Sequence, residues 1–333
     1  MKAMVIRQFG GPEVMRLEEV PTPKPGPGEV LIEMHAVSVN RTLDLIVRAG
    51  KYPRPINFPH VLGVDPAGTI VAVGEGVRTR KVGDRVVTYL RRHSVSPTET
   101  PVILGVNVWG GYAEYVKWLE ECTYIVPDGV DFVTACVVAR HAPLAFAMLR
   151  DKAQVKPGEW VLVMGAAGGL GSTAVQVAKY LGARVSAAGG ADDRVKSGLD
   201  LGADLGVNYR KQDLTAEVRR ITGRGADIVL ENIGDPDLFS KAFLSLGAGG
   251  RLVTAGSHGG GIVPVNVSHL YFNHITIMGW AGQTDDDMNA SLKAAAEGRL
   301  RCLVDRTLPF TEAAEAHRIV ADRAGLGKVV LVN

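Results

Sequence analysis

One segment of this chain constrains its fold more than any other. The apolar run at residues 160–164 is followed by Gly165-Ala166-Ala167-Gly168-Gly169-Leu170-Gly171, apolar residues then recur at helical spacing, and a second apolar run begins near residue 183. This order predicts strand, turn, helix and strand. Gly168 would let a backbone approach a pyrophosphate, Gly171 would let the helix pack close to the strand, and the first helical N–H groups would bind negative charge. A dinucleotide-binding βαβ unit is expected, although Ala166 replaces the first glycine of the pattern and an ordinary tight turn is the alternative.

The length and charge of the chain indicate a class of protein. At 333 residues it is long for one hydrophobic core, so two domains are expected. The net charge is +2 with scattered Lys and Arg, which argues against nucleic-acid binding and favours small-molecule partners. The three cysteines form no CxxC pair and predict no disulfide framework. No signal-peptide core and no apolar stretch long enough to span a bilayer is expected, which predicts a soluble, cytoplasmic protein without a membrane partner.

The style of the sequence changes near residue 125. Before it, short apolar runs separated by glycine and proline predict a β-rich domain. After it, strand-like runs alternate with helical patterns, which predicts an α/β fold with a doubly wound parallel sheet. The expected strands lie at residues 160–164, 183–187, 206–208, 226–230, 251–255 and 275–278, and the chain closes with an expected helix at 312–320 and strand at 328–332.

Several motifs in order resemble the medium-chain dehydrogenase/reductase superfamily over nearly the whole chain. The resemblance implies a GroES-like β-rich catalytic domain at residues 1–128, a Rossmann cofactor domain at residues 129–280, and a C-terminal segment at residues 281–333 that returns to the first domain. It also implies a homodimer or homotetramer paired through the strand from Ile275 to Gly279. The motifs that carry it are Leu62-Gly63-Val64-Asp65-Pro66-Ala67-Gly68, Lys81-Val82-Gly83-Asp84-Arg85-Val86, Trp109-Gly110-Gly111-Tyr112-Ala113-Glu114-Tyr115-Val116 and Gly327-Lys328-Val329-Val330-Leu331.

The superfamily divides on zinc, and this sequence lacks the ligands. A catalytic zinc requires about three Cys, His or carboxylate ligands. Where the zinc-dependent branch has its ligands, this chain has Asn40, Val64 and Arg140, and only Asp65 matches an acidic residue of that branch. No catalytic zinc is expected.

A structural zinc is not expected either. The segment at residues 91–100 matches the position of the four-cysteine lobe of the superfamily and contains no cysteine. His60, His93 and His141 show no ligand spacing, and surface or packing roles are the favoured interpretation.

The absence of a Lewis acid favours conjugate reduction, because hydrogen-bond donors alone can stabilise an enolate. The quinone oxidoreductase and enoyl reductase branches, which lack zinc, have an Asn-x-x-x-Asp segment followed by a tyrosine. Asn40, Asp44 and Tyr52 match this pattern. The resemblance implies that Asn40 and Tyr52 face the substrate, with the phenol as proton donor or orienting group.

Each of these residues also has a structural interpretation. Asn40 could cap a helix that begins at Arg41, with Asp44 as a first-turn charge facing the helix dipole. Tyr52 could be a loop aromatic with a solvated hydroxyl. Arg41 and Arg140 would be unusual beside a hydride-transfer site unless the substrate is anionic, such as a coenzyme A thioester.

Cofactor preference depends on the end of the second strand of the βαβ unit. An NAD site has Asp or Glu there, and this chain has Gly189. The resemblance matches Arg194 and Tyr209 to residues beside the 2′-phosphate of NADP, which favours NADP(H) over NAD(H). Against this, Asp192 and Asp193 add negative charge, and Arg194 could be a solvated residue at a helix start.

The complete set of expected cofactor residues follows from the glycine turn and from family position. The turn supplies Ala167, Gly168, Gly169 and Leu170 for the pyrophosphate; Gly189, Arg194, Tyr209 and Arg210 surround the 2′-phosphate; and Asn232, Gly256 and Lys328 are candidates by family position alone.

The sequence thus predicts an NADPH-dependent oxidoreductase that reduces activated C=C bonds or quinones by hydride transfer without zinc. Two alternatives stay open. One is an alcohol or ketone dehydrogenase of the same superfamily with a lost or atypical metal site. The other is an NADPH-binding protein without turnover, as the lens crystallins of this family illustrate.

Overall fold

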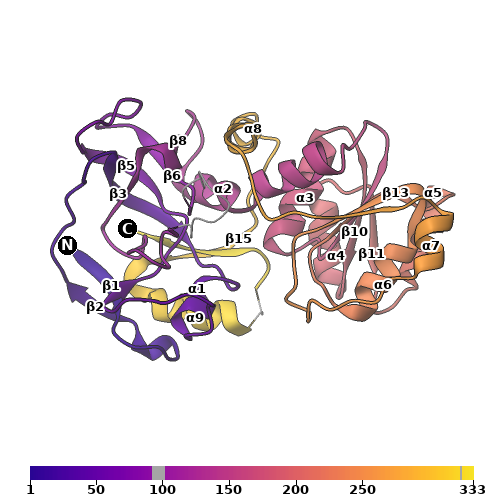
Figure 1. The fold of residues 1–333 in the computed structure, drawn as a ribbon, viewed down its shortest axis with the longest axis horizontal. Coiled ribbons are helices and arrows are strands. Elements are labelled where there is room, and N and C mark those ends of the chain that lie inside the picture. Colours follow the sequence, from indigo (N-terminus) through magenta and orange to yellow (C-terminus); the bar gives the residue numbers. More distant parts are fainter. Residues whose placement is uncertain (92–101, 323–324) are drawn as a thin grey trace. The chain divides into compact units, whose positions relative to one another are not determined.

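The computed structural model describes residues 1–91, 102–322 and 325–333. The chain forms two compact units, which we call unit 1 (Met1–Arg140 and Cys302–Asn333) and unit 2 (His141–Arg301) (Figure 1). Sequence analysis put the boundaries at residues 128 and 280. The chain instead leaves unit 1 inside helix α2 (Phe132–Phe146) and returns after residue 301, because α8 (Asp285–Ala296) belongs to unit 2.

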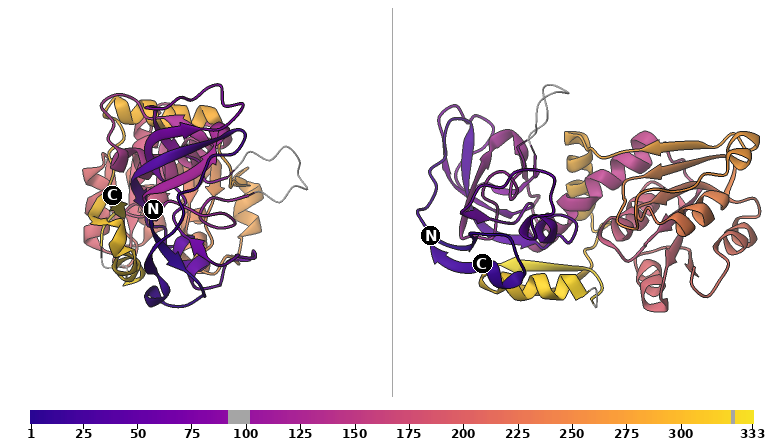
Figure 2. Two further views of the ribbon diagram at one scale, coloured as in Figure 1. Left: turned by 90° about the vertical axis from the view of Figure 1, so that its left-hand side faces the viewer. Right: turned by 60° about the horizontal axis from the view of Figure 1, so that its bottom comes forward.

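Unit 1 is β-rich, as its short apolar runs predicted. Its central strand β3 (Glu29–Ser38) pairs with strands of five to seven residues, and the last strand of the chain, β16 (Lys328–Val332), lies antiparallel to it with Leu331 opposite Val37. The C-terminal segment therefore completes a sheet begun by the N-terminal half (Figure 2). One sheet has the order β2-β1-β4 and the other β15-β16-β3-β5-β6-β8, with β7 also paired to β3.

The remaining elements of unit 1 are short, because glycine and proline interrupt the sequence frequently. They are β1 (Lys2–Ile6), η1 (Pro12–Val14), β2 (Arg16–Glu19), α1 (Asp44–Arg48), β4 (His60–Val61), β5 (Ala67–Val73), β6 (Arg85–Thr88), β7 (Tyr115–Leu119), η2 (Glu120–Cys122), β8 (Thr123–Ile125), β15 (Val304–Pro309), η4 (Phe310–Glu312) and α9 (Ala313–Asp322).

Unit 2 is the doubly wound parallel sheet that the alternating pattern predicted. Its strand order is β11-β10-β9-β12-β13-β14, and every neighbouring pair is parallel. The elements are η3 (Ala147–Lys152), β9 (Trp160–Met164), α3 (Gly169–Tyr180), β10 (Arg184–Gly189), α4 (Asp192–Asp200), β11 (Leu205–Asn208), α5 (Leu214–Thr222), β12 (Ala226–Glu231), α6 (Pro236–Leu244), β13 (Leu246–Thr254), α7 (Val267–Phe272), β14 (Thr276–Gly279) and α8.

The central strands of unit 2 are buried on both faces, which explains their nearly continuous apolar sequences. Helices α3 and α4 contact strands β9 to β11, and helices α5 and α6 contact strands β11 to β13. Leu162 and Met164 belong to the apolar cluster that contains Phe239 and Phe243 of α6. Because successive side chains of a strand point to opposite faces, Val161 and Val163 face the other helical layer.

One helical stretch corrects an expectation. Residues Phe132–Lys152 are long and apolar enough to cross a membrane by length and composition, whereas sequence analysis expected no such stretch. Within the structure, 67% of its most apolar window is buried, which is typical of the core helix of a folded protein. Apolar residues on several sides of one helix thus find protein partners here.

Candidate active site and cofactor site

The glycine turn after β9 forms a cradle at the start of α3. Gly165 has a φ of +63°, a left-handed conformation that favours glycine, and Gly168 is the N-cap residue of the helix. A Cβ atom on Gly171 would lie 2.1 Å from the carbonyl oxygen of Gly165, so only glycine lets the helix approach the turn this closely. The first N–H groups of the helix have no intrahelical acceptor. The turn around Ala167, Gly168, Gly169 and Leu170 therefore fits a pyrophosphate.

Other predicted cofactor residues lie at the same edge of the sheet. Asn232 follows β12, and its Oδ1 atom would lie 3.0 Å from a Cβ on Gly165. Gly256 follows β13 and contacts the backbone of Asn232 so closely that a Cβ would lie 1.9 Å from the Asn232 carbonyl oxygen. Since the strand order reverses between β9 and β12, these residues border the crevice in which such sheets bind ligands.

The ribose end of the candidate cofactor site lies at Gly189, the last residue of β10. The ring of Tyr209 lies over Gly190, since a Cβ there would meet the Tyr209 hydroxyl at 2.9 Å. Burial raises the pKa of Tyr209, and the charges of Arg210 and Arg194 oppose this rise. A Cβ on Gly189 would lie 3.2 Å from the Cβ of Arg194, and Arg210 directly follows Tyr209 in the chain. The structure thus brings together the residues that sequence analysis assigned to the 2′-phosphate.

Asp192 is engaged by partners that the sequence did not reveal. Its carboxylate contacts the Lys211 ammonium at 2.5 Å and accepts a hydrogen bond from Asn208 Nδ2 at 2.6 Å. Asp193 accepts from the backbone N–H of Arg194 at 2.8 Å. The carboxylate of Asp192, whose negative charge argued against NADPH, is therefore paired with a cation at the surface of unit 2.

Asn40 belongs to a buried polar cluster in unit 1. Its Nδ2 atom donates to Asp65 Oδ2 at 3.0 Å and contacts the carbonyl and hydroxyl oxygens of Ser38 at 3.2 Å. Asp65 also accepts from Ser38, from its backbone N–H at 2.8 Å and its hydroxyl at 2.5 Å. The amide hydrogens of Asn40 thus donate to acceptors within the protein. These contacts give Asn40 a positioning role.

Lys328 joins this cluster from β16. Its ammonium donates to Asn40 Oδ1 at 2.7 Å and to the Val39 carbonyl at 3.0 Å. Sequence analysis assigned Lys328 to the cofactor by family position. The structure gives it two acceptors in unit 1, and cofactor binding by its remaining N–H stays a prediction.

Asp44 lies fully buried at the first position of α1. It accepts from the backbone N–H of Asn40 at 2.7 Å and of Gly63 at 3.2 Å. Burial, followed by repulsion from Asp65, raises the pKa of Asp44 to about 7. The capping interpretation of Asn40 is wrong, because residues 41–43 form a turn, the helix begins at Asp44, and the carboxylate of Asp44 accepts from Asn40 rather than the reverse.

A chain of buried polar side chains lies next to Asp44, and the sequence did not reveal it. Burial and the charge of Asp44 raise the pKa of the Tyr112 phenol. The Tyr112 hydroxyl lies 3.2 Å from His317 Nε2, and His317 Nδ1 lies 3.1 Å from Arg48 Nη1. Since a guanidinium can only donate, His317 Nδ1 accepts, so Nε2 carries the proton and donates to Tyr112. Burial, with the charge of Arg48, lowers the pKa of His317 to about 3, so this imidazole is neutral at pH 7.

Tyr52 follows α1 and is partly buried. Its ring packs against the apolar cluster that contains Leu43 and Val47. Among the described residues, no side chain or backbone group forms a hydrogen bond with its hydroxyl. The phenol is therefore held by its ring while its hydroxyl remains free for a ligand or for water.

Two of the three histidines, His60 and His141, lie among the described residues and contact other parts of the protein. His60 is buried with Nε2 at 3.0 Å from the Gly105 carbonyl oxygen, and the ring of His141 contacts Gly169. His93 and residues 92–100 of the segment that matches the structural zinc lobe lie outside the described residues. Within residues 1–91, 102–322 and 325–333, no group of three His, Cys, Asp or Glu residues could hold a metal ion.

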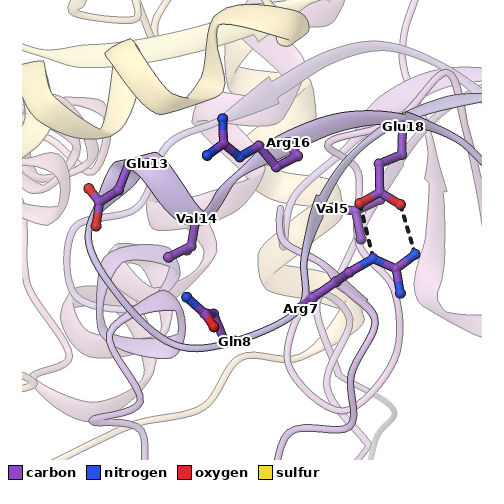
Figure 3. Close-up of a pocket in the computed structure, with 7 residues that line it drawn as sticks. All are labelled: Val5, Arg7, Gln8, Glu13, Val14, Arg16 and Glu18. Atoms are coloured by element: carbon purple, nitrogen blue, oxygen red, sulfur yellow. Dashed lines mark hydrogen bonds and ion pairs between the residues drawn. The ribbon is translucent and has the colours of Figure 1, made fainter.

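A pocket elsewhere in unit 1 contains none of these residues. It is lined by β1, β2 and the loop between them, and the ion pair of Arg7 with Glu18, 2.8 Å apart, closes one side (Figure 3). The other lining residues are Val5, Gln8, Glu13, Val14 and Arg16.

Two family models match the chain. Residues 26–128 match the alcohol dehydrogenase GroES-like domain, and residues 169–297 match the zinc-binding dehydrogenase model. Unit 1 and unit 2 therefore carry the two domain types that characterise a dehydrogenase with a pyridine-nucleotide cofactor. The chain belongs to the medium-chain dehydrogenase/reductase superfamily, where it is quinone oxidoreductase-like, and it is an oxidoreductase of that superfamily.

Individual relatives cover the whole chain. The quinone oxidoreductase of Sus scrofa is 33% identical over 100% of this chain and 98% of its own length. The crystal structure of an NAD-dependent alcohol dehydrogenase has a TM-score of 0.90 and 35% identity, covering 100% of both chains. A mycobacterial structure complexed with NADPH has a TM-score of 0.81 and 29% identity, again covering 100% of both chains.

Proposed function

We propose that this enzyme is a cytoplasmic, NADPH-dependent reductase of enones and quinones that works without zinc. The observation that carries this proposal is the arrangement around Asn40. An amide stands at a position where the zinc-dependent branch has a ligand, and Lys328, Ser38 and Asp65 engage it in hydrogen bonds. The sequence leaves three candidate functions: a reductase, an alcohol or ketone dehydrogenase, and an NADPH-binding protein without turnover. An activity assay separates them, because only a reductase oxidises NADPH with an enone or quinone.

NADPH is favoured by the charges at the end of β10. Gly189 offers no carboxylate to a ribose hydroxyl, and Arg194 and Arg210 lie near the Tyr209 phenol. The ion pair of Asp192 with Lys211 removes the main electrostatic objection. The NADPH complex of the mycobacterial relative supports the same preference.

The reaction needs a hydrogen-bond donor for the enolate oxygen of the substrate. When bound, the reduced nicotinamide supplies the hydride. The Tyr52 phenol, whose hydroxyl has no hydrogen-bond partner among the described residues, supplies the hydrogen bond and then the proton. Asp44 and Lys328 are positioning residues, because they hold the backbone and the side-chain oxygen of Asn40.

Metal analysis tests the zinc-independent part of the proposal. We expect purified enzyme to contain no stoichiometric zinc and to keep its enone reductase activity after dialysis against a chelator, because an amide, a valine and an arginine are poor zinc ligands. Elemental analysis that finds about one zinc per chain, with activity lost on chelation, would instead favour the alcohol dehydrogenase alternative.

We also propose that two copies pair through β14. This strand is an edge of the parallel sheet, and apolar side chains are exposed on it and on α7, including Phe272 (72% exposed) and Ile277 (37%). An exposed edge with an apolar surround is a template for pairing. Ile277→Asp is expected to shift the molecular mass in analytical ultracentrifugation from dimer or tetramer to monomer. A monomeric wild type would contradict the pairing.

A further inference from the structure

Arg140 lies on α2 of unit 1 and has no hydrogen-bond acceptor among the described residues. Its Nε atom has almost no exposed surface, and no hydrogen-bond partner lies near it in the described part of the chain. Neither does Arg140 form an ion pair with any described residue. A buried N–H group left unpaired destabilises the folded state, and more so when it is charged. Such a group in a native structure calls for a partner from outside the chain.

The carboxylates of the buried cluster already form other contacts. Burial lowers the pKa of Lys328, the attraction of Asp65 raises it, and the charge of Arg140 lowers it again. Cys136, one helical turn earlier on α2, also acts on Lys328, which indicates that this face of the helix looks toward the cluster. The nearby carboxylates do not compensate Arg140, because Asp65 is bound by Ser38 and Asn40, and Asp44 by two backbone N–H groups.

The phosphates of the cofactor have donors of their own in unit 2. The N-terminus of α3 fits the pyrophosphate, and Arg194 and Arg210 stand near the ribose end. A guanidinium in unit 1 is therefore available for the other ligand of the reaction. Its planar pair of N–H donors matches a carboxylate in a bidentate geometry.

We propose that Arg140 binds a carboxylate group of the substrate, so that the enzyme prefers α,β-unsaturated ketones that carry an acidic group. This inference rests on the proposed reductase function and names its substrate class. Arg140 is a specificity-determining residue in this proposal, because it contacts the carboxylate and neither the double-bond carbons nor the ketone oxygen.

The test compares one substrate in two charge states. We use 4-oxo-4-phenylbut-2-enoate and its methyl ester, which share the enone and differ in the carboxylate. For wild type we expect the higher kcat/KM with the acid. Arg140→Met should lower kcat/KM for the acid about 10- to 100-fold, mainly through KM, and change the ester less than about twofold, since a charged hydrogen bond contributes about 1.5–3 kcal/mol. Arg140→Lys should retain part of the preference, because it keeps the charge and loses the fork.

Controls separate this site from the fold and from the cofactor. Arg306→Met removes an exposed arginine of unit 1 that pairs with Asp305 and should leave both substrates unchanged. The Kd for NADPH should be the same in wild type and Arg140→Met. An unchanged acid-to-ester ratio, an equal loss for both substrates, or a weakened NADPH affinity would each overturn the proposal.

A binding measurement keeps the inference distinct from the proposed function. If wild type reduces neither enone, the reductase proposal fails, and calorimetry with the saturated 4-oxo-4-phenylbutanoate then decides on Arg140. Binding to wild type that is lost in Arg140→Met supports the carboxylate site, and absence of binding to wild type overturns it.

Discussion

Tyr52→Phe is expected to lower kcat for an enone about 100- to 1000-fold while leaving the Kd for NADPH unchanged. The phenol has no protein partner among the described residues, and its ring is held against the core, so the hydroxyl is poised to meet developing negative charge on the substrate. Removing one donor to an oxyanion costs about 2.7–4 kcal/mol. Stopped-flow oxidation of NADPH at saturating enone measures the loss in the reduction step.

A matched control is available in the same unit. Tyr115 of β7 is also partly buried and forms no side-chain hydrogen bond with a described residue, so Tyr115→Phe should leave kcat unchanged. An equal kcat for wild type and Tyr52→Phe would make Tyr52 a packing residue. A fall in thermal stability together with kcat would point to the same conclusion, whereas a fall in kcat alone supports the donor role.

Unit 2 was predictable because its determinants are local in sequence. The glycine turn, its strand and its helix lie within residues 160–180, and the steric reason for Gly171 concerns a residue only six positions away. Strand β9 runs over the residues expected, and the other strands differ by a few residues at their ends. The register of a doubly wound sheet then follows from the right-handed connections of βαβ units.

The buried cluster of unit 1 was not predictable, because its contacts join residues that are distant in sequence. Arg48 meets His317 across 269 positions, and Lys328 meets Asn40 across 288. No periodic pattern marks such pairs, and a lone histidine in a helical segment indicates nothing about its partner. The resemblance found Asn40 and Asp44, but their contacts, and hence their positioning roles, needed the structure.

The start of α1 illustrates the same limit at short range. Asn40 has good N-cap chemistry, and sequence alone favours a helix from Arg41. Asp44 instead takes the Asn40 N–H, and this buried carboxylate also binds the N–H of Gly63, which the sequence places 19 residues later. At Asn40 a tertiary contact thus overrides a local propensity. The charge of Asp192 likewise has a partner that local sequence does not reveal, because Lys211 lies on the next βα connection.

Arg194→Ala is expected to raise the Kd for NADPH about 10- to 100-fold and to leave the Kd for NADH unchanged. The loss of one charged hydrogen bond to the 2′-phosphate is worth about 1.5–3 kcal/mol, and NADH has no such phosphate. Fluorescence titration at fixed ionic strength measures both constants. Lys196→Met is the matched control, because Lys196 lies on the same helix and pairs with Asp200, away from Tyr209.

Variants at Lys211 test the same cofactor preference independently. Lys211→Met would free the charge of Asp192, which should weaken NADPH binding and spare NADH, and adding Asp192→Asn should restore it. Gly189→Asp should shift the preference toward NADH, because a carboxylate there accepts from a ribose hydroxyl and repels a phosphate. Its Cβ would lie 3.1 Å from Val195, so some loss of both affinities is expected and the ratio of the two constants carries the result.

The ratio of the dissociation constants for NADPH and NADH also defines the result that would contradict the assignment of NADPH. If wild type binds NADH as tightly as NADPH, and neither Arg194→Ala nor Lys211→Met changes that ratio, then the cations around Tyr209 are solvated surface charges. In that case no cation binds the 2′-phosphate although position 189 carries no carboxylate, and the assignment of NADP as the cofactor is wrong. A wild-type preference for NADPH that Arg194→Ala abolishes and Lys196→Met preserves would instead establish that charge at the end of β10, rather than the glycine turn, selects the cofactor.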